Sequence, residues 1–146
     1  MSMGNSKIDI KQRVLNSYNQ QAFMKLLGAE IVKLESGLVV IECPYKSVLT
    51  QQHGFLHAGV VTTLMDVACG YAALSTMPEG KEVLSVEFKT TLMRPAKADI
   101  FRAVGKVVKP GKRLTFCEGV IMDKETDKEF ARMTATMICV DINPLG

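Results

Sequence analysis

Residues Gln51 to Leu74 read QQHGFLHAGVVTTLMDVACGYAAL, a short polar loop that runs into a long and almost wholly apolar helix. Asp66 is the only charged residue of that predicted helix. A carboxylate in the middle of a core helix is costly unless it is paired, protonated or used in chemistry. The start of the same helix, at Ala58, supplies backbone N–H groups that stabilise anions. Together these two features indicate a hydrolytic site.

The composition limits the class of protein. A chain of 146 residues fits one domain with a proper core, and 47% hydrophobic and 23% charged residues are typical of an ordered globular protein. The net charge of +3 comes without an arginine-rich run, so we expect no nucleic-acid partner. The four cysteines lack metal-ligand spacing and are expected to be small buried side chains. Without a signal peptide or a span of about 20 apolar residues, we expect a cytoplasmic protein.

The order of predicted elements favours an α+β fold. Residues 8–27 predict a helix in two pieces, and the central helix is expected to run from His57 to Met77, before Pro78 and Gly80. Alternating apolar residues predict strands at 29–34, 38–43, 83–93, 98–108, 114–122 and 130–140. A helix that is apolar nearly all round must be surrounded, so we expect the antiparallel sheet to curl around it.

The strand at 83–93 is expected to have two unlike faces. Simple alternation places Ser85, Glu87 and Lys89 opposite an apolar face made of Leu84, Val86, Phe88, Thr90 and Leu92. The mixture of Thr, Lys and Glu with apolar residues on the outer strand face suits a surface partly covered by another subunit.

The chain resembles the hotdog-fold acyl-CoA thioesterases of the phenylacetic-acid-degradation (PaaI-like) type over roughly residues 27–140. The motifs that carry the resemblance are Gln51-x-x-Gly54-x-Leu56-His57-Ala58-Gly59, Leu64-Met65-Asp66, Leu84-Ser85-Val86-Glu87-Phe88 and Met93-Arg94-Pro95-Ala96. The resemblance implies a hotdog domain over residues 28–146, preceded by a helical extension over residues 1–27, within a single domain overall. It also implies a homodimer with a continuous sheet, and commonly a homotetramer.

Thioester hydrolysis needs an oxyanion donor and a base or nucleophile at one reacting carbon. The N–H of Ala58 is the natural donor, and Asp66 is the natural general base or nucleophile. The resemblance adds Gln51, which holds the carbonyl or water, His57, which orients the loop, and Ser85, which supports the water. Ala58 stands where the family more often has glycine.

The coenzyme A part of the substrate carries phosphates, which need cations at the rim of the pocket. The candidate substrate-binding residues are Gly59 at the helix start and the cations Arg94, Lys109, Lys112 and Arg113. The last three also fit an ordinary solvated turn. Val61, Leu64, Met65 and Tyr71 are expected to line the acyl pocket. We expect no metal and no cofactor beyond the coenzyme A of the substrate.

Ala58 and Asp66 are separated by eight helical residues, or roughly 12 Å. Both groups must lie about 3 Å from one reacting centre, so they cannot serve the same thioester from one helix. Two antiparallel helices related by a two-fold axis place Asp66 of one protomer beside the helix start of the other. The sequence therefore predicts two equivalent sites, each shared by two protomers.

Other readings remain open from the sequence. Asp66 has a structural alternative as a carboxylate bonded to Thr62 or Thr63. Alternative functions are a non-catalytic acyl-CoA-binding hotdog protein and a hotdog hydratase or dehydratase with His57 as base. The sequence does not specify the acyl group, nor whether Asp66 activates water or attacks directly.

Overall fold

A computed structural model describes residues 9–142 of the chain, and its strands form one antiparallel six-stranded sheet. The strands are β1 (Glu30–Glu35), β2 (Leu38–Pro44), β3 (Lys81–Leu92), β4 (Ile100–Lys109), β5 (Leu114–Asp123) and β6 (Glu129–Asp141). Their order across the sheet is β1-β2-β4-β5-β6-β3. The third strand therefore lies at an edge, next to the last strand, although the fourth follows it in the chain.

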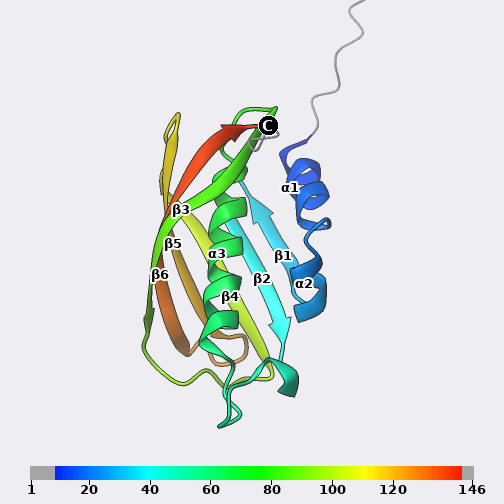
Figure 1. The fold of residues 1–146 in the computed structure, drawn as a ribbon, viewed down its shortest axis with the longest axis vertical. Coiled ribbons are helices and arrows are strands. Elements are labelled where there is room, and N and C mark those ends of the chain that lie inside the picture. Colours follow the sequence, from blue (N-terminus) through cyan, green and yellow to red (C-terminus); the bar gives the residue numbers. More distant parts are fainter. Residues whose placement is uncertain (1–8, 143–146) are drawn as a thin grey trace, which may run out of the picture.

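The long helix α3 (Ala58–Leu74) lies across one face of the sheet, which curls around it without closing (Figure 1). The N-terminal helices α1 (Ile10–Tyr18) and α2 (Ala22–Leu27) lie on the side of β1 and β2, and the short 3-10 helix η1 (Ser47–Leu49) precedes the loop into α3. The predicted α+β architecture of a curled antiparallel sheet around one central helix is confirmed. The predicted helix start at Ile8 lies outside the described residues.

Close contact between α3 and the sheet depends on Gly105 in β4. A Cβ atom added there would lie 2.2 Å from the backbone carbon of Ala68 and 2.4 Å from the backbone nitrogen of Cys69. Leu64, Met65 and Ala68 are fully buried on this side of the helix. A residue with a side chain at position 105 would push the helix away from the sheet, so glycine fixes how deeply α3 is seated.

The central helix ends earlier than the sequence predicted. Residues 75–77 no longer continue α3, because the N–H groups of Thr76 and Met77 donate to carbonyls three residues back instead of four. The Ser75 hydroxyl donates to the carbonyl of Ala72 (2.6 Å) and accepts from the N–H of Gly37 (2.7 Å). This serine ties the end of the helix to the β1–β2 hairpin, and α3 stops at Leu74.

The predicted simple alternation of β3 is wrong, because the strand contains a bulge. Ser85 pairs with Met137 and Glu87 pairs with Thr136, so Val86 is an extra residue in the ladder. Beyond the bulge, Phe88, Thr90 and Leu92 pair with Ala135, Met133 and Ala131, all of which are buried. Ser85 consequently lies on the same face as Phe88, Thr90 and Leu92, the face toward α3, whereas Leu84 lies on the other.

Candidate functional site

Asp66 and Ser85 form a hydrogen-bonded pair between the middle of α3 and the edge strand β3. The Ser85 hydroxyl donates to Asp66 Oδ1 at 2.7 Å. Burial raises the pKa of the Asp66 carboxyl above its ordinary value, and the hydrogen bond from Ser85 offsets part of that rise. The Thr63 hydroxyl donates instead to the carbonyl of Gly59, so the described partner of Asp66 is Ser85, not a threonine of its own helix. The β3 bulge brings Ser85 into this position.

The start of α3 is capped by His57. Its Nδ1 accepts a hydrogen bond from the N–H of Gly59 at 2.8 Å, as a helix N-cap does. The N–H groups of Val60 and Val61 donate to the His57 carbonyl. Among the described residues, none accepts from the N–H of Ala58. Of the two backbone groups considered for substrate, Ala58 is therefore available and Gly59 is already bonded.

Gln51 lies in the turn that leads into α3, facing the same cavity as Ala58. The Gln51 Oε1 accepts from the N–H of His53, and the Gln51 N–H donates to the carbonyl of Phe55 at 2.9 Å. A cavity of about 450 Å³ is lined by Gln51, His53, Ala58 and Arg94 together with apolar side chains. The side-chain NH₂ of Gln51 makes no hydrogen bond with a described residue. The loop thus holds two free donors, on Gln51 and Ala58, at the wall of one cavity.

The Asp66 side chain lines a different cavity from that of Gln51 and Ala58. Asp66 and Ser85 line a space of about 160 Å³, which neither Gln51 nor Ala58 lines. The separation of roughly 12 Å expected for eight helical residues agrees with this division. Each chain therefore carries a carboxylate half and a donor half that face separate cavities.

The predicted cations are not gathered in one place. Arg94 lines the cavity of Gln51 and Ala58, and its Nη1 donates to the carbonyl of Glu129 at 2.7 Å. Lys109 is the last residue of β4, and Lys112 and Arg113 lie in the turn to β5, at the end of the sheet opposite the loop before α3 (Figure 1). Within one chain, the structure thus brings only Arg94 to the donor half.

The four residues predicted to line the acyl pocket do not share one cavity within a single chain. Leu64 and Met65 are fully buried and line neither cavity, whereas Val61 and Tyr71 line the donor and carboxylate cavities respectively. The carboxylate cavity also includes Ser17, Gln21 and Gly70, which sequence reasoning missed. A glycine in the middle of a predicted helix was the only local signal, since glycine lowers helix stability. Nothing in the sequence indicated Ser17 and Gln21.

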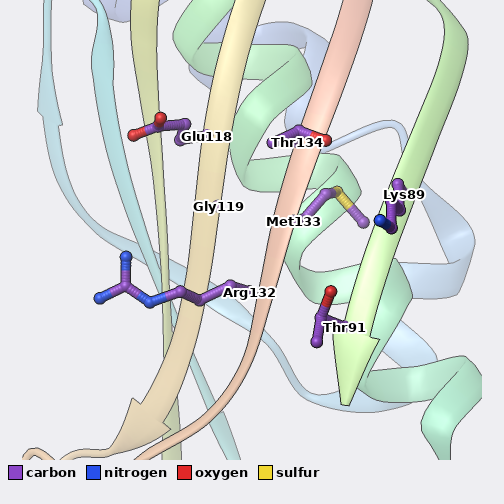
Figure 2. A pocket seen from close by; sticks show the side chains of 7 residues that line it. All are labelled: Lys89, Thr91, Glu118, Gly119, Arg132, Met133 and Thr134. Carbon is purple, nitrogen blue, oxygen red and sulfur yellow. The ribbon is translucent and has the colours of Figure 1, made fainter. Parts of the chain in front are cut away.

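A separate hollow of about 240 Å³ lies on the sheet surface formed by β3, β5 and β6, facing away from α3 (Figure 2). Its polar side chains include Lys89, Glu118 and Arg132. Arg132 is already bonded to both carboxylate oxygens of Glu129. None of the predicted site residues lines this hollow, so it is separate from both halves of the site.

Within residues 9–142, no group of three or more His, Cys, Asp or Glu side chains is placed to hold a metal ion. None of the helices described there is long and apolar enough to cross a membrane.

Comparisons with known proteins agree with this architecture. The sequence pattern of the thioesterase superfamily matches residues 53–130. A crystal structure of a thioesterase family protein from Silicibacter pomeroyi is 43% identical, with a TM-score of 0.88 over 90% of this chain and 98% of that chain. Human acyl-coenzyme A thioesterase 13 is 32% identical over 112 residues, which are 75% of this chain and 79% of the relative.

A solved structure at lower sequence identity shares the fold. The Escherichia coli PaaI protein of the phenylacetic acid degradation operon is 21% identical, with a TM-score of 0.83 over 92% of this chain and 96% of that chain. The matched segment spans 66% and 63% of the length of two candidate esterases from Saccharolobus solfataricus. The superfamily match covers more than half of the chain and includes the loop, α3 and β3. The chain therefore belongs to the thioesterase superfamily and has the hotdog fold of its PaaI-like members.

Proposed function

We propose that the protein hydrolyses acyl-CoA thioesters to a free acid and coenzyme A, at sites that two protomers share. The observation that carries this proposal is the separation of two complementary halves in one chain. The Asp66 carboxylate, bonded to Ser85, faces one cavity, and the free N–H of Ala58 faces another. A two-fold axis that sets two α3 helices antiparallel joins the carboxylate half of each protomer to the donor half of its partner.

The free edge of β3 supports this arrangement. The strand is 12 residues long, and in the described part of the chain only β6 pairs with it. Its side chains Val86, Phe88 and Leu92 are large, apolar and exposed. An edge of this kind readily pairs with another strand, and pairing with the partner's β3 would extend the sheet across the dimer. Asp66 and Ser85 lie beside this edge.

The chemistry follows from the two halves. The substrate carbonyl oxygen accepts from the Ala58 N–H, with Gln51 beside it, and the Asp66 carboxylate takes a proton from water as the water oxygen bonds to the carbonyl carbon. The carbonyl double bond then re-forms and the carbon–sulfur bond breaks. The proton that Asp66 took from water passes to the coenzyme A sulfur.

A second route keeps the same residues. Asp66 attacks the carbonyl carbon itself, expelling the thiolate of coenzyme A and forming a mixed anhydride that water hydrolyses. Single-turnover hydrolysis in oxygen-18 water tests the covalent route, because label enters Asp66 when water attacks the aspartyl carbon of the anhydride. Direct attack of water on the thioester puts the label only into the product acid.

His57 has a structural part in this proposal. Its Nδ1 is engaged by the N–H of Gly59, which holds the first turn of α3 and leaves the Ala58 N–H free. That engagement disfavours the hydratase alternative, in which His57 acts as the base. Arg94 is the cation that we assign to the phosphates of coenzyme A, since it lies at the donor cavity.

We further propose that two dimers assemble into a tetramer. The sheet face away from α3 exposes Leu84, Leu114 and Phe116 beside charged side chains, a mixture that suits contact with another dimer. The four cysteines are free thiols, which fits the reducing cytoplasm, where we place the protein. Sedimentation of the purified protein measures the assembly.

The function is tested by Asp66→Asn. We expect release of thiol from a panel of acyl-CoA esters to fall about 10²- to 10⁴-fold, because the amide can neither take the proton nor attack. The matched control is Asp99→Asn, the same change at an exposed aspartate, which should keep wild-type turnover. Near-normal turnover in Asp66→Asn contradicts the assignment, and tight ester binding without thiol release by the wild type supports the non-catalytic alternative.

Sharing of the site is tested by mixing two inactive variants. Ala58→Pro removes the N–H at the first helical position, where proline is well tolerated, and should inactivate the donor half without disturbing α3. After Asp66→Asn and Ala58→Pro subunits are mixed and refolded, random pairing should restore about one quarter of wild-type activity. Half of the dimers then contain one subunit of each variant, and each of these dimers has one intact site and one inactive site. No restoration would mean that both groups act from the same chain.

A further inference from the structure

The cavity beside Asp66 is closed on one side by the N-terminal helical segment. Asp66 and Ser85 lie at one end, and Ser17, Gln21 and Tyr71 line the side toward α1 and α2. The cavity measures about 160 Å³, comparable to an engineered protein cavity of about 150 Å³ that holds benzene. Its size suits one ring or a short chain next to the carboxylate.

The Tyr71 hydroxyl is the centre of a polar cluster in this cavity. It accepts a hydrogen bond from Gln21 Nε2 at 3.0 Å and shares another with the Ser17 hydroxyl at 3.0 Å. Tyr18 packs edge-on against the Tyr71 ring, with 5.7 Å between the ring centroids. Burial raises the pKa of Tyr71, so the phenol stays protonated at neutral pH and keeps a proton to donate. Gln21 Oε1 accepts from no described residue, which leaves the cluster with an unused acceptor.

Gly70 provides the space between the two ends. It lies one helical turn after Asp66 and lines the same cavity. Apart from its chain neighbours and the backbone of its own helix, a Cβ atom added there would meet no atom within 4 Å. This openness contrasts with Gly105, where close packing of the backbone requires glycine. At position 70 packing within the chain does not require glycine, although glycine is unfavourable in the middle of a helix.

We propose that this cavity receives the acyl group of the substrate, that Gly70 sets how wide that group can be, and that the Tyr71–Gln21–Ser17 cluster selects acyl groups with a hydroxyl or carbonyl at their far end. The inference rests on the proposed thioester hydrolysis, because Asp66 then fixes where the reacting carbon lies. An acyl group that ends in a methyl would displace water from the cluster without replacing its hydrogen bonds, which lowers the rate for that ester.

The polar selection is tested with two esters of equal size, 6-hydroxyhexanoyl-CoA and heptanoyl-CoA. We expect the wild type to have a kcat/KM about ten-fold higher for the hydroxy ester. Tyr71→Phe removes the hydroxyl and keeps the ring, so it should lower that ratio by about the same factor. Gln21→Leu removes the amide that donates to the Tyr71 hydroxyl, so it tests the same cluster. It replaces Tyr71→Phe as the test if that variant folds poorly.

The matched control is Tyr18→Phe. Tyr18 contacts the Tyr71 ring, but its hydroxyl donates to the carbonyl of Ala29 at 2.7 Å and its side chain does not line this cavity. This variant should keep the wild-type ratio between the two esters. A purely structural role of the tyrosine pair predicts the opposite, namely equal changes in both phenylalanine variants.

The width limit is tested with Gly70→Ala and Gly70→Val. Both should lower kcat/KM for ring-bearing or branched acyl-CoA esters relative to acetyl-CoA, and valine should do so more strongly than alanine. The melting temperature of Gly70→Ala should not fall, because its methyl group meets open space. Sedimentation of both variants checks that assembly is intact, so that a change in acyl preference reports on the cavity.

Failure of this inference and failure of the proposed reaction give different results. If the wild type releases thiol from none of the esters, the proposed function is wrong. If the wild type is active but the ester ratio is unchanged in Tyr71→Phe and Gln21→Leu, and the size preference is unchanged in the Gly70 variants, the acyl group binds elsewhere and this inference is overturned.

Discussion

The two sides of α3 differ in packing, because one side is closely packed against the sheet and the other faces a cavity. On the side toward the sheet, Leu64, Met65 and Ala68 are fully buried, and the helix backbone lies almost against Gly105. On the other side, Asp66 and Gly70 face a cavity instead of packed atoms. One helix therefore serves both as the centre of the core and as the support of a reactive group. The side of α3 that faces the cavity is therefore identified by a small residue, Gly70, and one acid, Asp66, and not by a row of polar residues.

The largest expected effect comes from a substitution on the packed side of α3. Gly105→Ala should destabilise the protein by about 3 kcal/mol or more, because its methyl group would overlap the backbone of Ala68 and force α3 off the sheet. Urea unfolding measures the change. Gly70→Ala is the matched change on the open side and should stabilise by up to about 1 kcal/mol. Similar losses in both variants would show that the two sides do not differ in packing.

The next effect concerns the hydrogen bond on the open side. Ser85→Ala should lower kcat/KM about ten-fold, because Asp66 loses its hydroxyl partner. That bond favours the ionised carboxylate, so its loss should raise the pKa of Asp66 further and move the acid limb of the pH–rate profile to higher pH. The profile of kcat/KM against pH measures the shift.

A control on the same strand sharpens this test. Thr90 lies on β3, and its buried hydroxyl has no partner among the described residues. Thr90→Val should leave the acid limb where it is in the wild type. An acid limb that moves equally in both variants would show that β3 acts through its packing instead of through the Ser85 hydroxyl.

The smallest expected effect is a gain in stability. Burial raises the pKa of Asp66 in the folded protein above its value in the unfolded chain, so folding favours the protonated acid. The ionised carboxylate therefore costs stability once the pH rises through the folded pKa. Asp66→Asn should melt at a higher temperature than the wild type at pH 7, and the difference should vanish below about pH 4.

Thermal melts of Asp66→Asn and Asp99→Asn across this pH range make the measurement. Asp99→Asn is the matched control, because it makes the same change at an exposed aspartate and should leave the melting temperature close to that of the wild type. A lower melting temperature for Asp66→Asn at pH 7 would indicate that the carboxylate stabilises the fold.

Much of the fold was predictable because its signals are local. The apolar run around Asp66, the turns and the strand alternation identify the elements within a few residues of their observed bounds. The strand order was not predictable in this way. Placing β3 next to β6 depends on pairing between residues about 40 to 60 positions apart, such as Leu92 with Ala131 and Lys81 with Asp141, and no local pattern encodes that choice.

The candidate site was predictable in part for the same reason. Asp66 and Ala58 belong to one helix and His57 caps its start, so their spacing follows from helix geometry. The hydrogen bond between Ser85 and Asp66 was not predictable, because it depends on the bulge at Val86. The roles of Ser17 and Gln21 depend on how α1 docks against α3, a contact between segments about 50 residues apart.

The extra residue at Val86 also divides β3 into two parts of opposite parity. Before it, odd-numbered positions such as Ser85 point toward α3, and after it the even-numbered positions Phe88, Thr90 and Leu92 do. Because Val86 is the extra residue, deleting it would restore one parity to the whole strand and keep both Ser85 and the apolar row on the face toward α3. The bulge therefore lets a strand with one more residue than its partner present both the serine and the apolar row to the helix.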